Sequence, residues 1–268
     1  MNQNKALWEK GDFTQIAETM RNSGAALVKK LGIKVGMKVL DLGCGDGTTA
    51  IPSARLGANV LGIDISSNLV NAAKKRAEGM ENCEFREGDA MDLAGIADET
   101  FDISMSIFGA MFAPRPDDVA REMVRVTRKG GRVVMGNWIP GDPTVAAQLL
   151  KISSAYTPSP PEGFISPMLW GIEEKVIERF TAAGIPKEDI SFERATFTFE
   201  ADFPPSEFVR RFKTFYGPTM NAFEAAEKEG KSADLESELE ALFERCNTGN
   251  QNHMVIPATY LLVTVNIR

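Results

Sequence analysis

The stretch from residue 39 to residue 49, which reads VLDLGCGDGTT, decides the fold. Its first four residues have the apolar character of a short buried strand, and Thr48 and Thr49 begin a helical pattern. Gly43 and Gly45, which lie between them, lack a Cβ atom, so the backbone can turn sharply and a ligand can approach it. The free N–H groups at the start of the helix can face a polar group of that ligand. The stretch therefore predicts a strand, a ligand-binding turn and a helix.

Strands and helices alternate outward from this loop. Further strands are predicted at residues 59–63, 83–86, 101–108 and 132–138, and helices at 48–56, 69–80 and 116–127. Another helix is predicted in the N-terminal segment from Asp12, where Gln15 completes a capping box. Strands separated by helices of this length predict a doubly wound α/β fold, a parallel sheet with helices on both faces.

The pattern changes after Trp138. Prolines exclude a regular element across the whole of residues 139–170, which we interpret as a lid. Helical spacing returns at 176–183, alternating phenylalanines predict a strand around Phe197 and Phe199, and two helices are predicted in 205–246 before a last strand at 259–267. We expect one domain over 1–268, with an N-terminal helical segment (1–35), a ligand-binding core (36–138), lid and helical cap elements (139–254) and a final strand (255–268).

An acid behind the loop indicates the class of ligand. Asp64 ends the second predicted strand, where doubly wound sheets hold a carboxylate that binds ribose hydroxyls. A dinucleotide fingerprint, GxGxxG, would need a third glycine at the position of Thr48. Here the glycines fall at 43, 45 and 47, and Asp41 precedes them. Its carboxylate can hold the ammonium group of a sulfonium amino acid, directly or through water. The spacing favours a sulfonium methyl donor over a dinucleotide.

An ordered series of motifs resembles the class I S-adenosylmethionine-dependent methyltransferases over about residues 36–138. LDLGCGDG (40–47) is similar to the first motif of that family, and GIDIS (62–66) to the strand end with its ribose-binding acid. Gly88-Asp89-Ala90 resembles the adenine-contacting segment, residues 101–108 the fourth strand, and 125–132 the turn before the fifth strand. Within the family, the chain most resembles the broad group that includes ubiquinone and menaquinone biosynthesis methyltransferases.

The resemblance implies a Rossmann-like, mostly parallel seven-stranded sheet with an antiparallel last strand and a helical cap. It implies S-adenosylmethionine as cofactor and S-adenosylhomocysteine as product. The cofactor-binding residues that it implies or that the spacing indicates are Asp41, Gly43, Cys44, Gly45, Asp64, Ile65, Leu69, Asp89, Ala90 and Ser106. It also implies methyl transfer to a small molecule. Two sets of side chains suit an apolar or aromatic acceptor: the stripe Phe208, Phe212, Phe215 and Tyr216, and the methionines Met105, Met111, Met168 and Met220.

The catalytic residues are left open by the sequence. Methyl transfer from a sulfonium needs a general base only if the acceptor must lose a proton. His253 is the candidate base because its ordinary pKa lies near neutrality. Alternatively, it is a surface or helix-capping histidine with no catalytic role. Cys44 is interpreted as a small packing residue near the donor rather than a nucleophile. Trp8 and Phe13 either close over the cofactor or pack the N-terminal helix.

Composition argues against several other classes. The net charge of −7 and the pI of about 5.0 argue against a nucleic-acid partner, since phosphate backbones are held by clustered Lys and Arg. Three distant cysteines and one histidine predict neither disulfides nor a metal site. The polar N-terminus lacks the apolar core of a signal peptide, and no run approaches the ~20 apolar residues of a membrane span. We therefore expect a cytoplasmic protein.

Two alternative functions remain open at this point. The first is an NAD(P)-dependent oxidoreductase on a related Rossmann-like fold, which predicts a Tyr-x-x-x-Lys pair, but Tyr156 is followed four positions on by Pro160. The second is a non-catalytic protein that binds S-adenosylmethionine. A nucleic-acid amino-methyltransferase is disfavoured because residues 106–109, SIFG, replace the (D/N)PP(Y/F) motif of that group.

Overall fold

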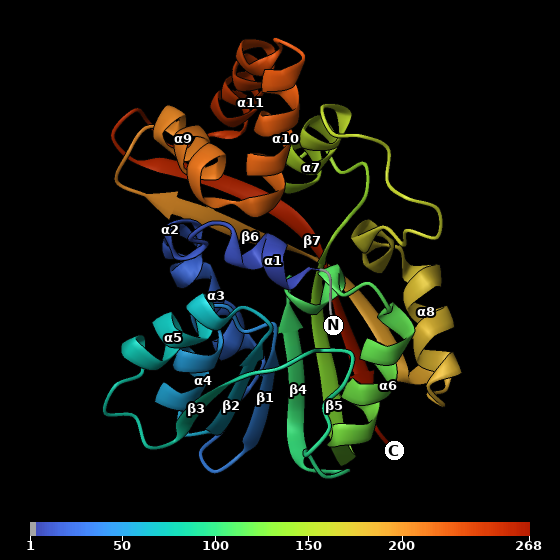
Figure 1. The fold of residues 1–268 in the computed structure, drawn as a ribbon. Coiled ribbons are helices and arrows are strands. Elements are labelled where there is room, and N and C mark those ends of the chain that lie inside the picture. The colour runs from blue at the N-terminus through green and yellow to red at the C-terminus, as the bar shows by residue number, and fades with distance from the viewer. Residues whose placement is uncertain (1–3) are drawn as a thin grey trace.

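The computed structural model describes residues 4–268, and its centre is a seven-stranded sheet in the order β3-β2-β1-β4-β5-β7-β6 (Figure 1). The first five strands run parallel, and β7 runs antiparallel to both β5 and β6. This arrangement confirms the predicted fold, including its antiparallel last strand. The strands are β1 (Lys38–Leu42), β2 (Asn59–Asp64), β3 (Cys83–Glu87), β4 (Phe101–Ile107), β5 (Thr127–Trp138), β6 (Ile190–Ala201) and β7 (Met254–Asn266).

The order of the strands fixes the place of the ligand. β1 is flanked by β2 on one side and β4 on the other, so the chain changes direction across the sheet at β1. Ligands of doubly wound sheets bind at such a switch point, beyond the carboxyl ends of the strands. Val39, Leu40 and Leu42 of β1 are fully buried, as expected for a strand covered on both faces. The glycine loop follows β1 directly and therefore lies at this edge.

Helices cover both faces of the sheet (Figure 1). Those that contact the strands β1 to β3 are α4 (Ala50–Arg55) and α5 (Ser67–Arg76), and α3 (Arg21–Lys30) packs on α4 and β6. On the other side of the switch point, α6 (Pro116–Val126) contacts β4, β5 and α8 (Glu173–Ala182). Short 3₁₀ turns link these elements, at Glu18–Met20, Ala110–Phe112, Pro167–Gly171 and Lys187–Asp189. None of the helices in the described part of the chain is long and apolar enough to cross a membrane.

A helical cap lies beyond the carboxyl edge of the sheet (Figure 1). It consists of α9 (Pro205–Phe215), α10 (Gly217–Lys228) and α11 (Ser232–Cys246), which follow β6 in the chain. Of these, α10 and α11 pack on α7 (Val145–Ala155), and α9 packs on α10 and α11. The sequence predicted two of these three helices. The third, α10, was not predicted, although its start at Gly217-Pro218 is compatible with a helix. A proline in the first turn of a helix is favourable, since the N–H that it lacks would have no helical partner.

The other differences from the predicted elements also have local causes. The helix predicted from Asp12 is divided into α2 (Thr14–Ala17), a 3₁₀ turn and α3, and a short helix that was not predicted, α1 (Lys5–Glu9), precedes it. The predicted capping box at Asp12 does not form, because α2 begins after Phe13; Asp12 instead accepts hydrogen bonds from Thr14 and from the side chain of Gln15. β7 begins at Met254 rather than at 259, and it contains Pro257 where β6 is its one neighbour, so the missing N–H breaks no ladder on the other side.

Candidate functional site

The glycine loop turns tightly at the carboxyl end of β1. Gly43 and Gly45 have φ angles of +70° and +55°, in the left-handed region that favours glycine. The N–H groups of Gly43 and Cys44 both donate to the carbonyl oxygen of Ile63, which ties the loop to the end of β2. A Cβ atom added at Gly45 would meet no heavy atom within 4 Å, so this side of the loop faces open space. The loop therefore offers bare backbone to a ligand.

Asp64 stands beside this loop, at the end of β2. Its Oδ2 accepts the Gly45 N–H at 2.8 Å and its Oδ1 accepts the Ser66 N–H at 2.9 Å. The side chain is almost completely buried, and this burial raises the pKa of Asp64 above its ordinary value. Each oxygen retains a further lone pair, so the carboxylate can accept two hydroxyl hydrogens from a ligand. That geometry suits the two hydroxyls of a ribose.

Asp41 lies behind the loop. Its Oδ2 accepts the hydroxyl of Thr49 at 2.6 Å, and the residue is only 1% exposed. Burial raises the pKa of Asp41 to about 7. The carboxyl group therefore braces the start of α4, and it does not line the pocket described below. The spacing that indicated an ammonium partner could not distinguish a side chain facing the ligand from one enclosed beneath it.

The turn that follows β4 packs against the glycine loop. Phe108 has a φ of +64°, which is strained for a residue with a bulky side chain. Next to it, Gly109 lies so close to Gly43 that an added Cβ would be 2.4 Å from the Gly43 carbonyl oxygen. Ser106, predicted to bind the cofactor, accepts the Ala110 N–H through its Oγ at 2.9 Å and is 1% exposed. Ser106 thus holds this turn and does not line the pocket.

The segment after β3 contributes backbone and small side chains. Gly88 and Ala90 line the pocket. Asp89, which lies between them, is half-buried, and its Oδ1 accepts the Met91 N–H at 2.9 Å. The carboxylate of Asp89 is thus engaged in shaping its own loop and is not among the lining groups.

Helix α1 crosses the carboxyl edge of β3 and the start of α5. Lys5 forms an ion pair with Glu87, and Glu9 accepts the N–H of Ser67 at 3.0 Å and its hydroxyl at 2.7 Å. These contacts hold Trp8 over the site, where its ring meets those of Phe112 and Tyr216 at centroid distances of 5.0 and 5.9 Å. Trp8 and Phe13 both line the pocket and pack on other aromatic rings, so both roles considered from the sequence are present.

These parts enclose one large aromatic chamber. The space within it has a volume of about 1170 Å³, which includes the part of its mouth that is open to solvent. One end is formed by Gly43, Gly45, Asp64, Ile65, Leu69 and Ala90, six of the predicted cofactor-binding residues. The other end is apolar and comes from distant segments: Met20, Phe108, Phe112, Trp138, Val145, Ala146, Leu149, Leu150, Phe199, Phe208, Phe212, Tyr216 and Phe243. The polar and apolar ends thus belong to one continuous space.

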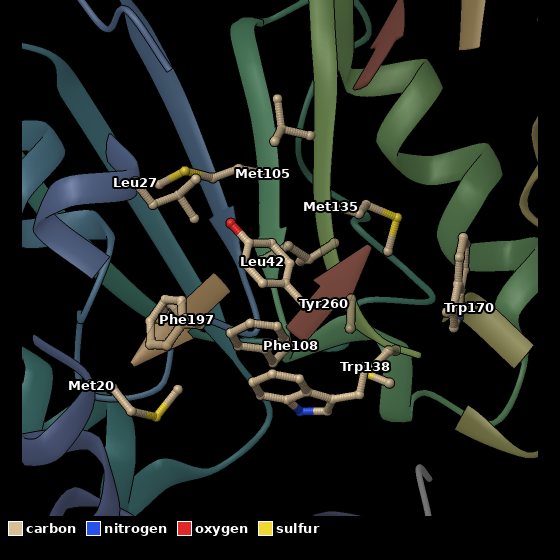
Figure 2. Packing of buried hydrophobic residues seen from close by; sticks show 14 of the residues in the cluster. Met20, Leu27, Leu42, Met105, Phe108, Met135, Trp138, Trp170, Phe197 and Tyr260 are labelled. Atoms are coloured by element: carbon tan, nitrogen blue, oxygen red, sulfur yellow. The ribbon is translucent and has the colours of Figure 1, made fainter. Parts of the chain in front are cut away.

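The floor of the chamber is a pair of stacked aromatic rings. The rings of Phe108 and Trp138 lie parallel with centroids 3.7 Å apart, and Phe197 and Tyr260, which do not line the chamber, pack edge-on against Phe108 (Figure 2). These four rings connect the carboxyl ends of β4 and β5 to the middle of β6 and β7. Sequence reasoning found part of this apolar lining. Of its proposed stripe, Phe208, Phe212 and Tyr216 line the chamber and Phe215 does not, and Met105, Met111, Met168 and Met220 all lie elsewhere.

Two other predicted residues lie outside the main chamber. Cys44 is buried beside it and lines a smaller adjoining hollow, and burial raises the pKa of its thiol well above the ordinary value, which suits packing and not nucleophilic attack. His253 lies at the turn before β7, where its Nδ1 and Nε2 contact Asp202 at 2.7 Å and Glu200 at 3.3 Å. It does not line the chamber, so the structure does not support its role as the base. Among residues 4–268, no cluster of acidic, histidine or cysteine side chains could hold a metal.

Comparisons with known proteins agree with this geometry. The family model for a methyltransferase domain matches residues 40–135, which hold the loop and Asp64. An uncharacterized protein of Mycobacterium tuberculosis is 35% identical over 242 residues, which cover 89% of this chain and 86% of that protein. A demethylmenaquinone methyltransferase of Paenarthrobacter aurescens is 38% identical over 112 residues, covering 42% of this chain and 43% of that enzyme.

A solved structure extends the likeness to the fold of nearly the whole chain. Phosphoethanolamine N-methyltransferase 2 of Haemonchus contortus, determined in complex with S-adenosylmethionine, superimposes with a TM-score of 0.58 at 19% sequence identity. The match covers 92% of this chain and 53% of that one. At this identity the comparison shows the fold, and the ligand named there is that protein's own.

Proposed function

We propose that this chain, which belongs to the class I S-adenosylmethionine-dependent methyltransferases, transfers the methyl group of its cofactor to an apolar small molecule. The observation that carries the proposal is the composition of the chamber. Its donor end presents backbone and one carboxylate, and its other end is lined by aromatic and aliphatic side chains. Burial of apolar surface drives binding in such a space, so an acceptor with an apolar body is favoured.

The donor end fits the cofactor. Gly45 faces open space, and the Asp64 carboxylate, fixed by two backbone N–H groups, is positioned to accept both ribose hydroxyls. Ile65, Leu69 and Ala90 supply apolar surface beside it, suited to an adenine ring. When bound, S-adenosylmethionine supplies an activated methyl group on a sulfonium with a good leaving group.

The protein's own contribution to the reaction is alignment and the exclusion of water. The loop and Asp64 fix one reactant, and the stack of Phe108 and Trp138 together with the cap shapes the space for the other. Holding two reactants in line can supply up to ~7–11 kcal/mol of barrier lowering. No histidine, lysine or cysteine side chain lines the described chamber, which is consistent with transfer that relies on positioning rather than on a dedicated base.

The proposal is tested by product identification. The protein is incubated with methyl-labelled S-adenosylmethionine and a metabolite extract, and the labelled products are partitioned between water and an organic solvent and identified by mass spectrometry. We expect label in the organic phase together with formation of S-adenosylhomocysteine. Label confined to highly polar metabolites would contradict an apolar acceptor, and absence of S-adenosylhomocysteine would support a binding protein without catalysis.

Two variants make this experiment specific to the chamber. Asp64→Ala removes the acceptor of both ribose hydroxyls and should weaken donor binding more than about tenfold, or ~1.4 kcal/mol, with a matching loss of product at low donor concentration. His253→Ala changes a residue outside the chamber and should leave the product yield unchanged. Unaltered donor affinity in Asp64→Ala would show that the ribose binds elsewhere.

A further inference from the structure

A single tyrosine places a hydroxyl group in the apolar half of the chamber. Tyr216 lies at the junction of α9 and α10 and is 8% exposed. No hydrogen bond within residues 4–268 involves its phenol oxygen, although the ring lines the chamber. The oxygen is also not among the fully enclosed polar atoms that lack a partner, so it retains access to the open space of the chamber.

The other polar side chains of the chamber have different tasks or capacities. Asp64 belongs to the donor end and is bonded to the loop. Asn4 donates through its Nδ2 to the carbonyl oxygen of Phe112 at 2.6 Å. The indoles of Trp8 and Trp138 can donate but cannot accept. Tyr216 therefore supplies the one hydroxyl of the described lining, a group that can both donate and accept.

The position of this hydroxyl is fixed by close packing on both sides. The ring meets Phe212 edge-on at 5.2 Å and Trp8 at 5.9 Å between centroids. On either side of Tyr216, the backbone touches the N-terminal segment so closely that only glycine fits. A Cβ atom added at Gly217 would be 2.2 Å from the carbonyl oxygen of Leu7, and one added at Gly11 would be 2.2 Å from that of Phe215. The hydroxyl is thus held in one place before a ligand arrives.

This hydroxyl carries an energetic cost once an apolar ligand fills the chamber and excludes water from it. A buried polar group without a partner destabilises a protein by ~1–3 kcal/mol, and most buried polar groups in native structures are therefore bonded. Burial also raises the pKa of Tyr216 further above its ordinary value, so the phenol stays protonated at neutral pH. A ligand atom that pairs with the hydroxyl would remove this cost in the bound state.

We propose that Tyr216 is a positioning residue that holds, by a hydrogen bond, the polar atom of an otherwise apolar acceptor. This inference rests on the proposed function, because it assigns the acceptor to the aromatic half of the chamber. It defines the acceptor class more closely, as an aromatic or aliphatic body that carries a hydroxyl or carbonyl oxygen. A pure hydrocarbon would leave the hydroxyl unpaired and would bind less well.

The test compares matched pairs of probes that differ in one hydroxyl. In the presence of saturating S-adenosylhomocysteine, equilibrium dialysis measures the affinities of 1-naphthol against 1-methylnaphthalene, and of 4-butylphenol against 4-butyltoluene. The proteins are the wild type, Tyr216→Phe and, as a matched control, Tyr260→Phe, which removes the hydroxyl of a buried tyrosine outside the chamber lining. For at least one pair, we expect Tyr216→Phe to weaken binding of the hydroxyl probe about tenfold and to leave that of the methyl probe unchanged.

The outcomes separate this inference from the proposed function. If both members of each pair bind Tyr216→Phe as they bind the wild type, Tyr216 holds no polar atom and the inference is wrong, while the apolar acceptor stands. If no probe binds the wild type, the apolar acceptor itself is contradicted, and the inference with it. An equal loss for the hydroxyl and methyl probes would show that Tyr216→Phe alters packing, which also contradicts a specific hydrogen bond. Tyr260→Phe should change neither affinity.

Discussion

At the scale of single residues, one close backbone contact of the site joins two glycines from distant parts of the chain. Gly43 belongs to the loop after β1 and Gly109 to the turn after β4. A Cβ atom added at Gly109 would lie 2.4 Å from the oxygen and 2.7 Å from the Cα of Gly43, and these are backbone atoms that cannot rotate away. The donor loop therefore has its shape only while position 109 is glycine.

This contact predicts the effect of Gly109→Ala. The added methyl group should displace the loop and weaken binding of S-adenosylhomocysteine at least tenfold, as measured by calorimetry. Gly136→Ala is the matched control, because its nearest neighbours are the side chains of Ile107 and Tyr260 at 3.3 Å, which can adjust. We expect the control to bind within about twofold of the wild type. Equal affinities for Gly109→Ala and the wild type would show that the loop adapts.

Asp41 predicts a pH dependence of stability. Burial raises its folded-state pKa to about 7 from an ordinary value of 3.8, so the folded protein holds a proton that the unfolded chain releases. The contribution of Asp41 to the free energy of unfolding is therefore fully present below pH 3.8 and is lost as the pH rises to about 7, with a slope of up to ~1.4 kcal/mol per pH unit. Denaturant unfolding of the ligand-free protein between pH 5 and 8 should show this decline.

The variant Asp41→Asn isolates this effect. An amide of nearly the same shape cannot ionise, so its stability should fall less steeply between pH 5 and 7 than that of the wild type. Asp64, whose pKa burial also raises, remains in both proteins and shifts both curves alike. Parallel curves for the two proteins would place the raised pKa elsewhere.

Sequence reasoning located the residues of the donor end better than it assigned their tasks. The loop and Asp64 could be predicted because a tight turn needs glycine at fixed spacing, and because the acid ends the neighbouring strand. The tasks of Asp41 and Ser106 depend on the direction of the side chain at a strand end, which spacing alone does not set. Both acids of the first two strands are buried, but Asp64 lines the chamber and Asp41 does not.

At the scale of elements, α1 connects the cofactor end of the chamber to the cap. It contacts β3 through Lys5 and Glu87, α5 through Glu9 and Ser67, and the start of α10 through Leu7 and Gly217. The helix has five residues and no buried ones, so its place depends on these contacts rather than on its own stability. Loss of any one of them should loosen the cover over the site.

Gly217→Ala tests this dependence. The substitution favours the helix in which Gly217 lies, but its methyl group would be 2.2 Å from the Leu7 oxygen and should push α1 away from the cap. We expect faster amide hydrogen exchange in residues 5–9 and severalfold weaker binding of S-adenosylhomocysteine. Glu9→Ala, which removes the contact with Ser67 at the other side, should have the same effects. If both variants exchange like the wild type, α1 is held by other forces.

The elements that the sequence predicted poorly are those that build the apolar end of the chamber. The strands of the core were predicted because apolar runs between helices mark a parallel sheet. α7 lies inside the proline-rich region interpreted as a lid, since Pro143 and Pro158 fall outside its bounds, and α10 begins at a glycine-proline pair. Local composition can predict where such helices are interrupted, but which surface they cover depends on contacts between segments far apart in the chain.

At the scale of the whole molecule, three regions of the chain together form the chamber. The sheet supplies the donor end, the N-terminal segment supplies Trp8 and Phe13, and α7 and the cap supply the apolar end. Because these regions surround one space, a ligand at the donor end should stabilise all of them. The stabilities of the three regions are then coupled, because each of them supplies part of the site and none contains it alone.

This coupling gives the last prediction. At a concentration of about 100 times its dissociation constant, S-adenosylhomocysteine should stabilise the wild type by ~2.7 kcal/mol and raise Tm by about 5 °C or more. Amide hydrogen exchange should slow not only in residues 43–66 but also in α1, α7 and α9, because all of them face the chamber. Asp64→Ala at the same ligand concentration should show little of either change, since it binds the ligand more weakly. Protection confined to residues 43–66 would mean that the donor site folds around its ligand independently of the cap.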